Sequence, residues 1–360
     1  MKPSAGKPPT SHWSAPIPSA CTPRAGSPPN SVTVSNMTES RRSLVREPAG
    51  AARATETPTG KAIWIDTDIV FNRFPEDVDD GLALMMALDS PAVRIRGISL
   101  NRRVDNGARV TRRLLGHYAR YEIPVYKGTD DIFASYGHCT EAVDRLAEAL
   151  QRERLTIVAI GAATNLANLL TFYPEQAGNI DEIVFCAGRS AGTRFNAGSS
   201  RVGLPDANFD NDPRSFLRVL DAGIPITLSG FEAASSVWLD RRDILRIARN
   251  GRPGDRWVAR RLRMWHVAWR LGLRLDGFIP FDACTIGHVL YPECFDYHRD
   301  IPVQINLRDN DARRWRKDPQ KQYLEASYAF ESPYRVDFAY AASPRYKDKL
   351  MYHLLGQASS

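Results

Sequence analysis

Short apolar runs alternate with helical patterns along most of this chain, and this alternation restricts the fold more than any other feature. Strand-like runs are expected at 61–65, 94–100, 155–160, 182–187, 224–229 and 334–340. Helices are expected at 79–89, 105–121, 140–152, 164–172, 212–222, 240–250, 255–272, 282–290 and 345–355. Near-continuous apolar strands suit a parallel sheet that is covered on both faces. We therefore predict an α/β fold, with a mostly parallel central sheet and helices on both faces, Rossmann-like in type.

The first 60 residues differ from the rest of the chain. They are rich in Pro, Ser, Thr, Ala and Gly and have no apolar periodicity, which is typical of disorder. Seven basic and three acidic residues place +4 of the formal net charge of +7 in this segment, so the basic balance does not require nucleic-acid binding. We expect a disordered or targeting tail over 1–60 and a single folded domain over 61–355.

The composition of the remaining chain argues against a membrane protein. No apolar run approaches the roughly 18 residues that a transmembrane helix needs. The five cysteines show no metal-binding CxxC pair, and a reducing, cytoplasmic location fits them best. The polar stretch 308–322 is expected to be an exposed loop between C-terminal strands.

Four aspartates follow the first strand-like run in two close pairs. Asp66 and Asp68 come at its end, while Asp79 and Asp80 open an apolar helical run. Carboxylates at such positions are costly unless they meet a cation or a reacting group. A helix N-cap with surface acids is the plainer alternative. The convergence of four oxygen-donor side chains nevertheless favours a hard-cation site, for Ca²⁺ or Mg²⁺.

Five motifs in order resemble those of the nucleoside hydrolase family of the inosine–uridine type. The first is formed by the Asp-x-Asp and Asp-Asp pairs just described, and the second is Asn101 after the second strand. The third is the Gly161-Ala-Ala-Thr-Asn-Leu-Ala turn, and the last two are Asp206-Ala-Asn-Phe-Asp-Asn-Asp-Pro and Phe281-Asp282. The resemblance covers about 61–355 and implies a nucleoside hydrolase-like catalytic domain.

The resemblance also implies a mechanism. Asp68, Asp80, Asp282 and the backbone carbonyl of Thr164 would bind Ca²⁺. Asp79 would act as general base for a metal-bound water, which would attack the ribosyl carbon and release base and ribose. The side chains that would hold the ribose are Asn101, Asp206 and Asn208. The family commonly forms dimers or tetramers, so a homo-oligomer is expected, with a small-molecule nucleoside as substrate.

The chain departs from the family pattern on the side of the leaving base. Phe281 stands where many purine-accepting members have a histidine that protonates the base. A ten-residue insertion, 69–78, includes Asp77, which competes with Asp79 as candidate base. On the helix 255–272, Trp257, Trp265 and Trp269 share a face by spacing. They are either core or a stacking wall for a base, in which case His266 would be the replacement proton donor.

Two other functions compete with this reading. Asp66-Thr-Asp68 after a strand also resembles the start of an aspartyl-nucleophile phosphatase of the haloacid dehalogenase type, although a later acidic pair is missing. A non-catalytic nucleoside-binding relative is the second alternative, because Phe281 removes one catalytic group.

Overall fold

The computed structural model describes residues 59–71, 76–130, 137–312, 314–315 and 317–357. Residues 1–58 of the expected tail and 72–75 of the insertion lie outside the described residues. Within the described part of the chain, no helix is both long and apolar enough to cross a membrane.

Ten strands form one sheet in the described residues. In spatial order they are β3 (Val125–Lys127), β2 (Val93–Leu100), β1 (Lys61–Thr67), β4 (Leu155–Ile160), β5 (Ile180–Phe185), β7 (Ile226–Ser229), β10 (Arg335–Ala342), β8 (Phe295–Asp309), β9 (Gln320–Ala326) and β6 (Arg189–Ser190). Neighbours from β3 to β10 are parallel, whereas β8 is antiparallel to both β10 and β9. The sheet is therefore mostly parallel, as predicted.

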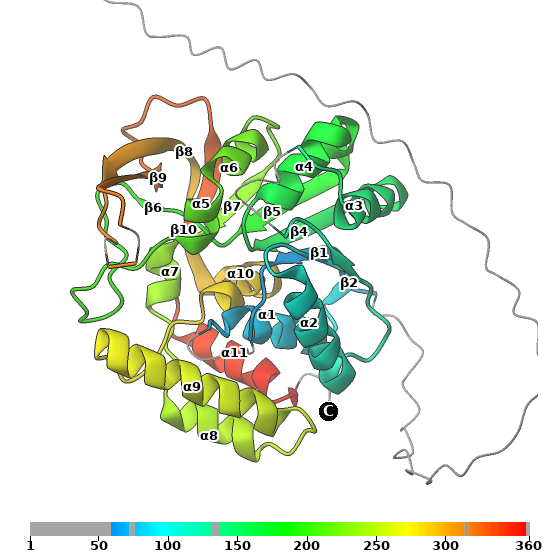
Figure 1. The fold of residues 1–360 in the computed structure, drawn as a ribbon, viewed down its shortest axis with the longest axis vertical. Helices are drawn as coiled ribbons and strands as arrows, with labels where there is room; N and C mark the ends of the chain where they lie inside the picture. Colours follow the sequence, from blue (N-terminus) through cyan, green and yellow to red (C-terminus); the bar gives the residue numbers. More distant parts are fainter. Residues whose placement is uncertain (1–58, 72–75, 131–136, 313, 316, 358–360) are drawn as a thin grey trace, which may run out of the picture. The chain divides into compact units, whose positions relative to one another are not determined.

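Helices cover both faces of the parallel strands (Figure 1). On one face lie α1 (Asp79–Asp89), α2 (Val104–Tyr118), α10 (Phe281–Leu290) and α11 (Arg345–Leu354), and on the other lie α3 (Glu141–Arg152), α4 (Thr164–Phe172) and α6 (Pro213–Leu220). The remaining helices are α5 (Ala207–Asn211), α7 (Phe231–Ser235), α8 (Arg241–Arg249) and α9 (Asp255–Leu273), with 3₁₀ turns at Pro174–Asn179 and Pro292–Cys294.

The side chains of β1 show why this sheet needs two covering layers. Ile63 and Ile65 point into the core shared with α1, α2, α10 and α11, whereas Trp64 points into the core shared with α3, α4 and α6. Successive strand residues face opposite sides of a sheet, so an unbroken apolar run is stable only when both sides are buried. The Trp64 indole N–H finds a partner in Ser99 Oγ at 2.9 Å on the neighbouring strand.

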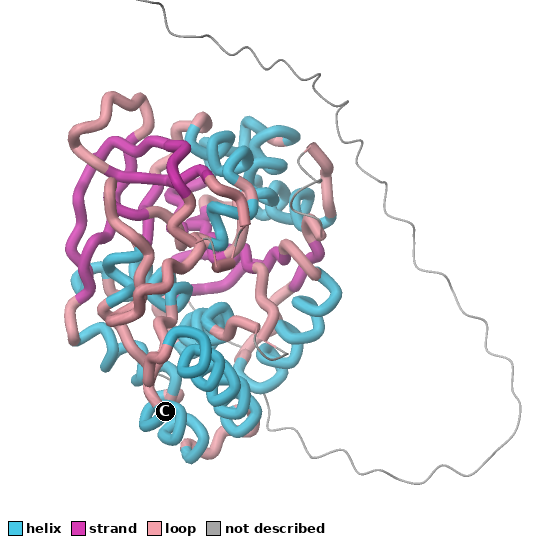
Figure 2. The backbone as a smooth tube through the Cα atoms, turned by 60° about the vertical axis from the view of Figure 1, so that its left-hand side comes forward, coloured by secondary structure: helices cyan, strands magenta, loops and turns pink. Residues whose placement is uncertain are grey.

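Most predicted elements lie where the sequence placed them, and α1 and α4 have the predicted bounds. The sequence did not predict β3, β6, β8, β9, α5 or α7. The long strand β8 is partly exposed along most of its length, so it has no continuous apolar run to reveal it. The β8–β9 hairpin lies on the left of Figure 1, away from α3 on the right, and Figure 2 shows the strands in magenta and the helices in cyan.

Candidate active site

A cavity of about 270 Å³ lies beyond the carboxyl ends of the parallel strands. Asp68 follows β1, Cys186 follows β5 and Ser229 ends β7, and all three line it. The first residues of α1 and α10 close the same end. Ligands of open α/β sheets bind at this edge, so the position alone makes the cavity the candidate site.

Three buried carboxylates meet at one end of this cavity. Asp79, Asp80 and Asp282 each bring an oxygen within 4.8 Å of the others. They begin α1 and α10, two helices that pack against each other. The Thr67 hydroxyl donates to Asp80, and the Asp282 backbone N–H donates to Asp79 Oδ2 at 3.4 Å. Two helix N-termini thus point at one acidic cluster, a favourable direction for the helix dipoles.

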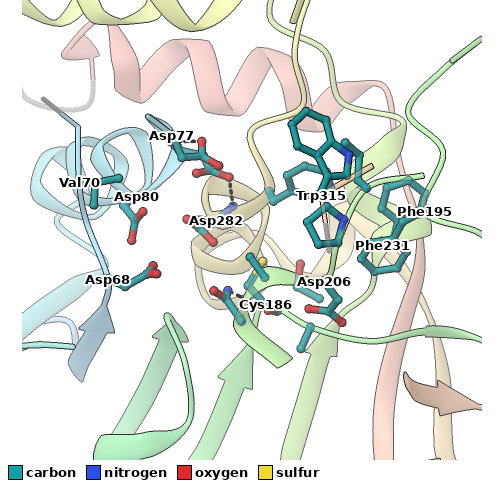
Figure 3. A pocket seen from close by; sticks show the side chains of 18 of the residues that line it. Asp68, Val70, Asp77, Asp80, Cys186, Phe195, Asp206, Phe231, Asp282 and Trp315 are labelled. Atoms are coloured by element: carbon teal, nitrogen blue, oxygen red, sulfur yellow. Dashed lines mark hydrogen bonds between the residues drawn. The ribbon is translucent and has the colours of Figure 1, made fainter. Parts of the chain in front are cut away.

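Asp68 faces the same cluster from the end of β1. In Figure 3 its carboxylate points toward those of Asp80 and Asp282. Its one ion pair among the described residues is with Arg102, whose Nη1 lies 3.4 Å from Asp68 Oδ2. The sequence-predicted ligands Asp68, Asp80 and Asp282 therefore line one end of the cavity, together with the predicted base, Asp79.

Burial and mutual repulsion disturb the ionisation of these groups. Burial raises the pKa of both Asp68 and Asp79 to about 6. Burial, together with the charge of Asp68, raises the pKa of Asp80 well above its usual value. Burial, together with the charge of Asp79, raises the pKa of Asp282 well above its usual value. A positive charge nearby would favour the ionised form of all four carboxylates.

The donor set fits a hard cation. Within the described residues, no Lys or Arg lies in ion-pair distance of Asp79, Asp80 or Asp282, although all three are buried. Nearby, the Oδ1 atom of Asn101 is buried and has no hydrogen-bond partner in the described structure. Carboxylate and amide oxygens are the ligands that Ca²⁺ and Mg²⁺ take. A divalent cation would supply the compensating charge that the described protein lacks here.

Asp66 has a supporting position instead. It is fully buried and accepts hydrogen bonds from Ser99 Oγ, from Asn101 Nδ2 at 2.9 Å and from Asn165 Nδ2 at 2.8 Å. Burial raises its pKa to about 7 in spite of these donors. Because a nucleophile must be exposed to its substrate, this enclosed carboxylate does not fit the aspartyl phosphatase alternative.

The first residues of α4 form hydrogen bonds with Asp66 and Asp212. The Thr164 hydroxyl donates to Asp212 Oδ2 at 2.5 Å, and the Asn165 amide reaches Asp66 and the Leu100 carbonyl. Neither Thr164 nor Asn101 is among the residues that line the cavity, and both are buried. Asn101 donates to the Ala162 carbonyl at 3.1 Å as well as to Asp66.

Asp206 and Asn208 line the middle of the cavity. Asp206 caps α5 and accepts from the backbone N–H groups of Gly188, at 2.8 Å, and Phe209, at 3.3 Å. The Asn208 amide donates to the Cys186 carbonyl at 3.0 Å. Both side chains are therefore held in place by backbone groups before any ligand arrives, a geometry suited to hydroxyl recognition.

Asp77, which belongs to the insertion 69–78, is part of the site. Its carboxylate lines the cavity and accepts from the backbone N–H groups of Val78, at 2.6 Å, and Asp79, at 3.4 Å. Burial and the neighbouring charge of Asp79 raise its pKa well above its usual value. Asp77 thus lies on the carboxylate side of the cavity in Figure 3.

The three tryptophans on one face of α9 have two different environments. Trp265 and Trp269 line the cavity, as Phe281 does. Trp257 instead packs against Phe71, with ring centroids 5.3 Å apart, under the Arg113 guanidinium. His266 is buried but does not line the cavity, and its Nε2 lies 3.1 Å from a carboxylate oxygen of Asp276.

Several lining residues were not predicted from the sequence. They are Arg102, Cys186, Phe195, Phe231 and Trp315. Trp315 belongs to the β8–β9 loop, and its indole N–H donates to the Gly203 carbonyl at 3.0 Å. A lone tryptophan in the otherwise polar stretch 308–322 was the available signal. The two phenylalanines look like ordinary core residues in the sequence, and only the fold brings them to the cavity.

Comparisons with known proteins agree with this geometry. The family described as inosine-uridine preferring nucleoside hydrolase matches residues 63–325. The pyrimidine-specific ribonucleoside hydrolase RihA of Klebsiella pneumoniae is 28% identical over 250 residues, which is 60% of this chain and 78% of the relative. RihA of Salmonella typhimurium is 27% identical over 249 residues, 60% of this chain and 78% of the relative.

Solved structures show the same fold. The plant nucleoside hydrolase PpNRh1 has a TM-score of 0.64 at 19% identity, with 82% of this chain and 99% of that chain covered. The inosine-uridine preferring nucleoside hydrolase from Bacillus anthracis has a TM-score of 0.64 at 16% identity, with the same coverage of 82% and 99%.

Proposed function

The chain belongs to the inosine–uridine preferring nucleoside hydrolase family, and we propose that it hydrolyses ribonucleosides with a Ca²⁺ ion and a carboxylate base. As a member of this family it is an N-glycosyl hydrolase that acts on the N-glycosidic bond of a ribonucleoside. The observation that carries the proposal is the buried carboxylate cluster without a basic partner among the described residues.

Asp68, Asp80 and Asp282 would hold the Ca²⁺ ion, with the Thr164 backbone carbonyl as a further ligand. All four groups offer oxygen atoms, which suits Ca²⁺. When bound, the ion would supply positive charge that makes water more acidic and keeps these carboxylates ionised. Ser99, Asn101 and Asn165 would fix Asp66, and through it the strand end that carries Asp68.

Asp79 would accept the proton of the attacking water. The oxygen of that water forms a bond to the anomeric carbon of the ribose, the carbon–nitrogen bond breaks, and its electron pair leaves with the base. Asp206 and Asn208 would hold the ribose hydroxyls, since both line the cavity and both are oriented by backbone groups. Asn101 would be a third contact of the ribose hydroxyls, as the family resemblance implies, although it does not line the cavity.

Metal dependence is tested by removal and restoration. The purified protein is treated with a chelator, then supplied with Ca²⁺ or Mg²⁺, and ribose release is measured over a panel of nucleosides. Asp80→Asn should lose both bound metal and activity. Asp243→Asn, which changes an equally buried carboxylate on α8 outside the cavity, should keep both. Full activity after complete metal removal would contradict the proposal.

The role of Asp79 is tested separately. Asp79→Asn should keep the metal and lower turnover by about 10²–10⁴-fold, the usual contribution of a general base. Metal content and turnover are measured on the same preparation. Parallel loss of metal would reassign Asp79 to ion binding, a role that its place in the three-carboxylate group also allows. An inactive protein that still binds nucleosides with metal present would favour the non-catalytic alternative.

A homo-oligomer, dimer or tetramer, and a cytoplasmic location remain predictions from the sequence. Size-exclusion chromatography with light scattering measures the oligomeric state.

A further inference from the structure

The end of the cavity opposite Asp68 and Asp80 carries the rings of Phe195, Phe231 and Trp315 (Figure 3). Phe231 stacks on Phe195, with centroids 4.1 Å apart and planes 17° apart, and on Phe281 at 5.9 Å and 26°, so Phe281 joins this aromatic end. Trp265 and Trp269 of α9 also line the cavity, so its aromatic rings come from five separate segments. A leaving base placed here would meet mainly ring faces and edges. The indole Nε1 of Trp265 is buried and without a partner in the described structure.

The aromatic rings themselves cannot protonate a leaving base. Among the described lining residues there is no Lys, His or Tyr, and Arg102, the one basic side chain, pairs with Asp68 at the opposite end. His266 is turned toward Asp276. A neutral nucleoside releases its base as an anion unless a proton is delivered. This arrangement should therefore cleave neutral nucleosides slowly.

The carboxylates that line the cavity favour a cation. Asp206 lies beside Phe231 in Figure 3, and Asp77 lines the carboxylate side of the same cavity. The Arg189 guanidinium lies 4.2 Å from the centre of the Phe195 ring, but its charge is compensated by a buried aspartate. Aromatic faces attract cations through their quadrupole, and most strongly when water is excluded. Phe195 and Phe231 are almost completely buried, so their surroundings exclude most water.

We propose that the aromatic end accepts a base with a fixed positive charge, so that the preferred substrates are ribosides of N-alkylated bases. This inference rests on the proposed hydrolytic function. Water oxygen bonds to the anomeric carbon, its proton passes to Asp79, and the electron pair of the broken carbon–nitrogen bond neutralises the cationic ring. The base departs neutral and needs no proton, which matches a cavity whose described lining residues include no Lys, His or Tyr.

Binding and turnover of matched pairs test the proposal. Guanosine is compared with 7-methylguanosine, and cytidine with 3-methylcytidine, on the full-length protein with Ca²⁺. Dissociation constants are measured on the Asp79→Asn variant, so that the greater chemical lability of the methylated compounds does not enter. The cationic member of each pair should bind about 5- to 30-fold more tightly, the range that cation–aromatic contacts give. Equal affinities within each pair would overturn the inference.

Two tryptophans on α9 provide a matched comparison. Trp265→Leu should remove most of the preference for the cationic member, because this ring lines the cavity. Trp257→Leu, a change of the same size on the same helix, should leave the preference intact, because Trp257 packs on Phe71 instead. If the two variants behave alike, the preference does not come from the aromatic end.

Turnover separates this inference from the function on which it rests. The wild type should hydrolyse the cationic member of each pair at least 10²-fold faster, and Phe281→His should narrow that ratio by accelerating the neutral member. If Asp77→Asn selectively abolishes cleavage of neutral nucleosides, an acid is present and the inference fails. If no riboside is cleaved, including an activated nitrophenyl riboside, the hydrolytic function fails, and the binding pairs still decide the cation preference.

Discussion

Replacement of Arg189 by methionine should destabilise the protein strongly, because this residue forms a buried ion pair. Arg189 Nη1 lies 2.6 Å from Asp311 Oδ2, and the two side chains are only 3% and 9% exposed. The guanidinium also donates to the Thr193 carbonyl at 3.0 Å and lies 4.2 Å and 4.5 Å from the ring centres of Phe195 and Tyr323. Arg189 thereby links Phe195 of the aromatic end to the β8–β9 loop.

The expected cost follows from burial. Removal of one partner leaves the other charge buried without compensation, which costs about 3–5 kcal/mol. Asp311 keeps the Tyr323 hydroxyl, 2.8 Å away, so the lower half of that range is expected. Arg299 and Asp337 form an ion pair of similar length, 2.5 Å, but their side chains are 61% and 32% exposed. Arg299→Met should therefore cost at most about 1 kcal/mol.

Urea unfolding followed by tryptophan fluorescence measures both free energies. The double variant Arg189→Met/Asp311→Asn removes both charges and should be about 1–3 kcal/mol more stable than the sum of its single changes predicts. Arg189→Met should also weaken substrate binding, because Phe195 loses the guanidinium that packs on it. A cost no larger than that of Arg299→Met would refute the argument from burial.

Three further predictions concern stability. Chelation should lower the unfolding temperature, since an ion at a hundred times its Kd adds about 2.7 kcal/mol to the folded state, and scanning calorimetry with and without Ca²⁺ checks this. Gly287→Ala should cost about 1–3 kcal/mol in urea unfolding, because a Cβ atom there would lie 2.4 Å from the buried Tyr346 ring. Burial lowers the pKa of His288 to about 3, so below pH 6.5 only the unfolded chain takes up this proton. Stability should fall by up to about 1.4 kcal/mol per pH unit between pH 6.5 and 3, and His288→Gln should lack this part of the decline.

The carboxylate half of the candidate site could be located from the sequence because its position depends on local rules. Asp68, Asp79 and Asp80 lie next to strand and helix ends, and both α1 and the end of β1 could be located from apolar periodicity. Parallel strands bring such ends to one edge, so the convergence followed from the fold class.

The aromatic half could not be predicted in the same way. Phe195 and Phe231 lie in a loop and a short helix without a periodic signal, and Trp315 lies in a stretch that seemed only polar and exposed. Their meeting depends on β8 and β9, which are partly exposed strands with little apolar continuity. Antiparallel strands of this kind, paired over a long range and partly exposed, have only a weak pattern in a single sequence.

Three rings of the cavity lie on other parts of the chain than the carboxylates. The carboxylates lie after the end of β1 and at the starts of α1 and α10, whereas Trp265, Trp269 and Trp315 lie on α9 and in the β8–β9 loop at the periphery. Base preference can therefore be altered without disturbing bond cleavage. In a randomised library, variants with new substrate choice should cluster in 257–273 and 310–319, and inactive variants in 66–68, 79–80 and 282. The peripheral segments are the natural targets for engineering this hydrolase toward other ribosides.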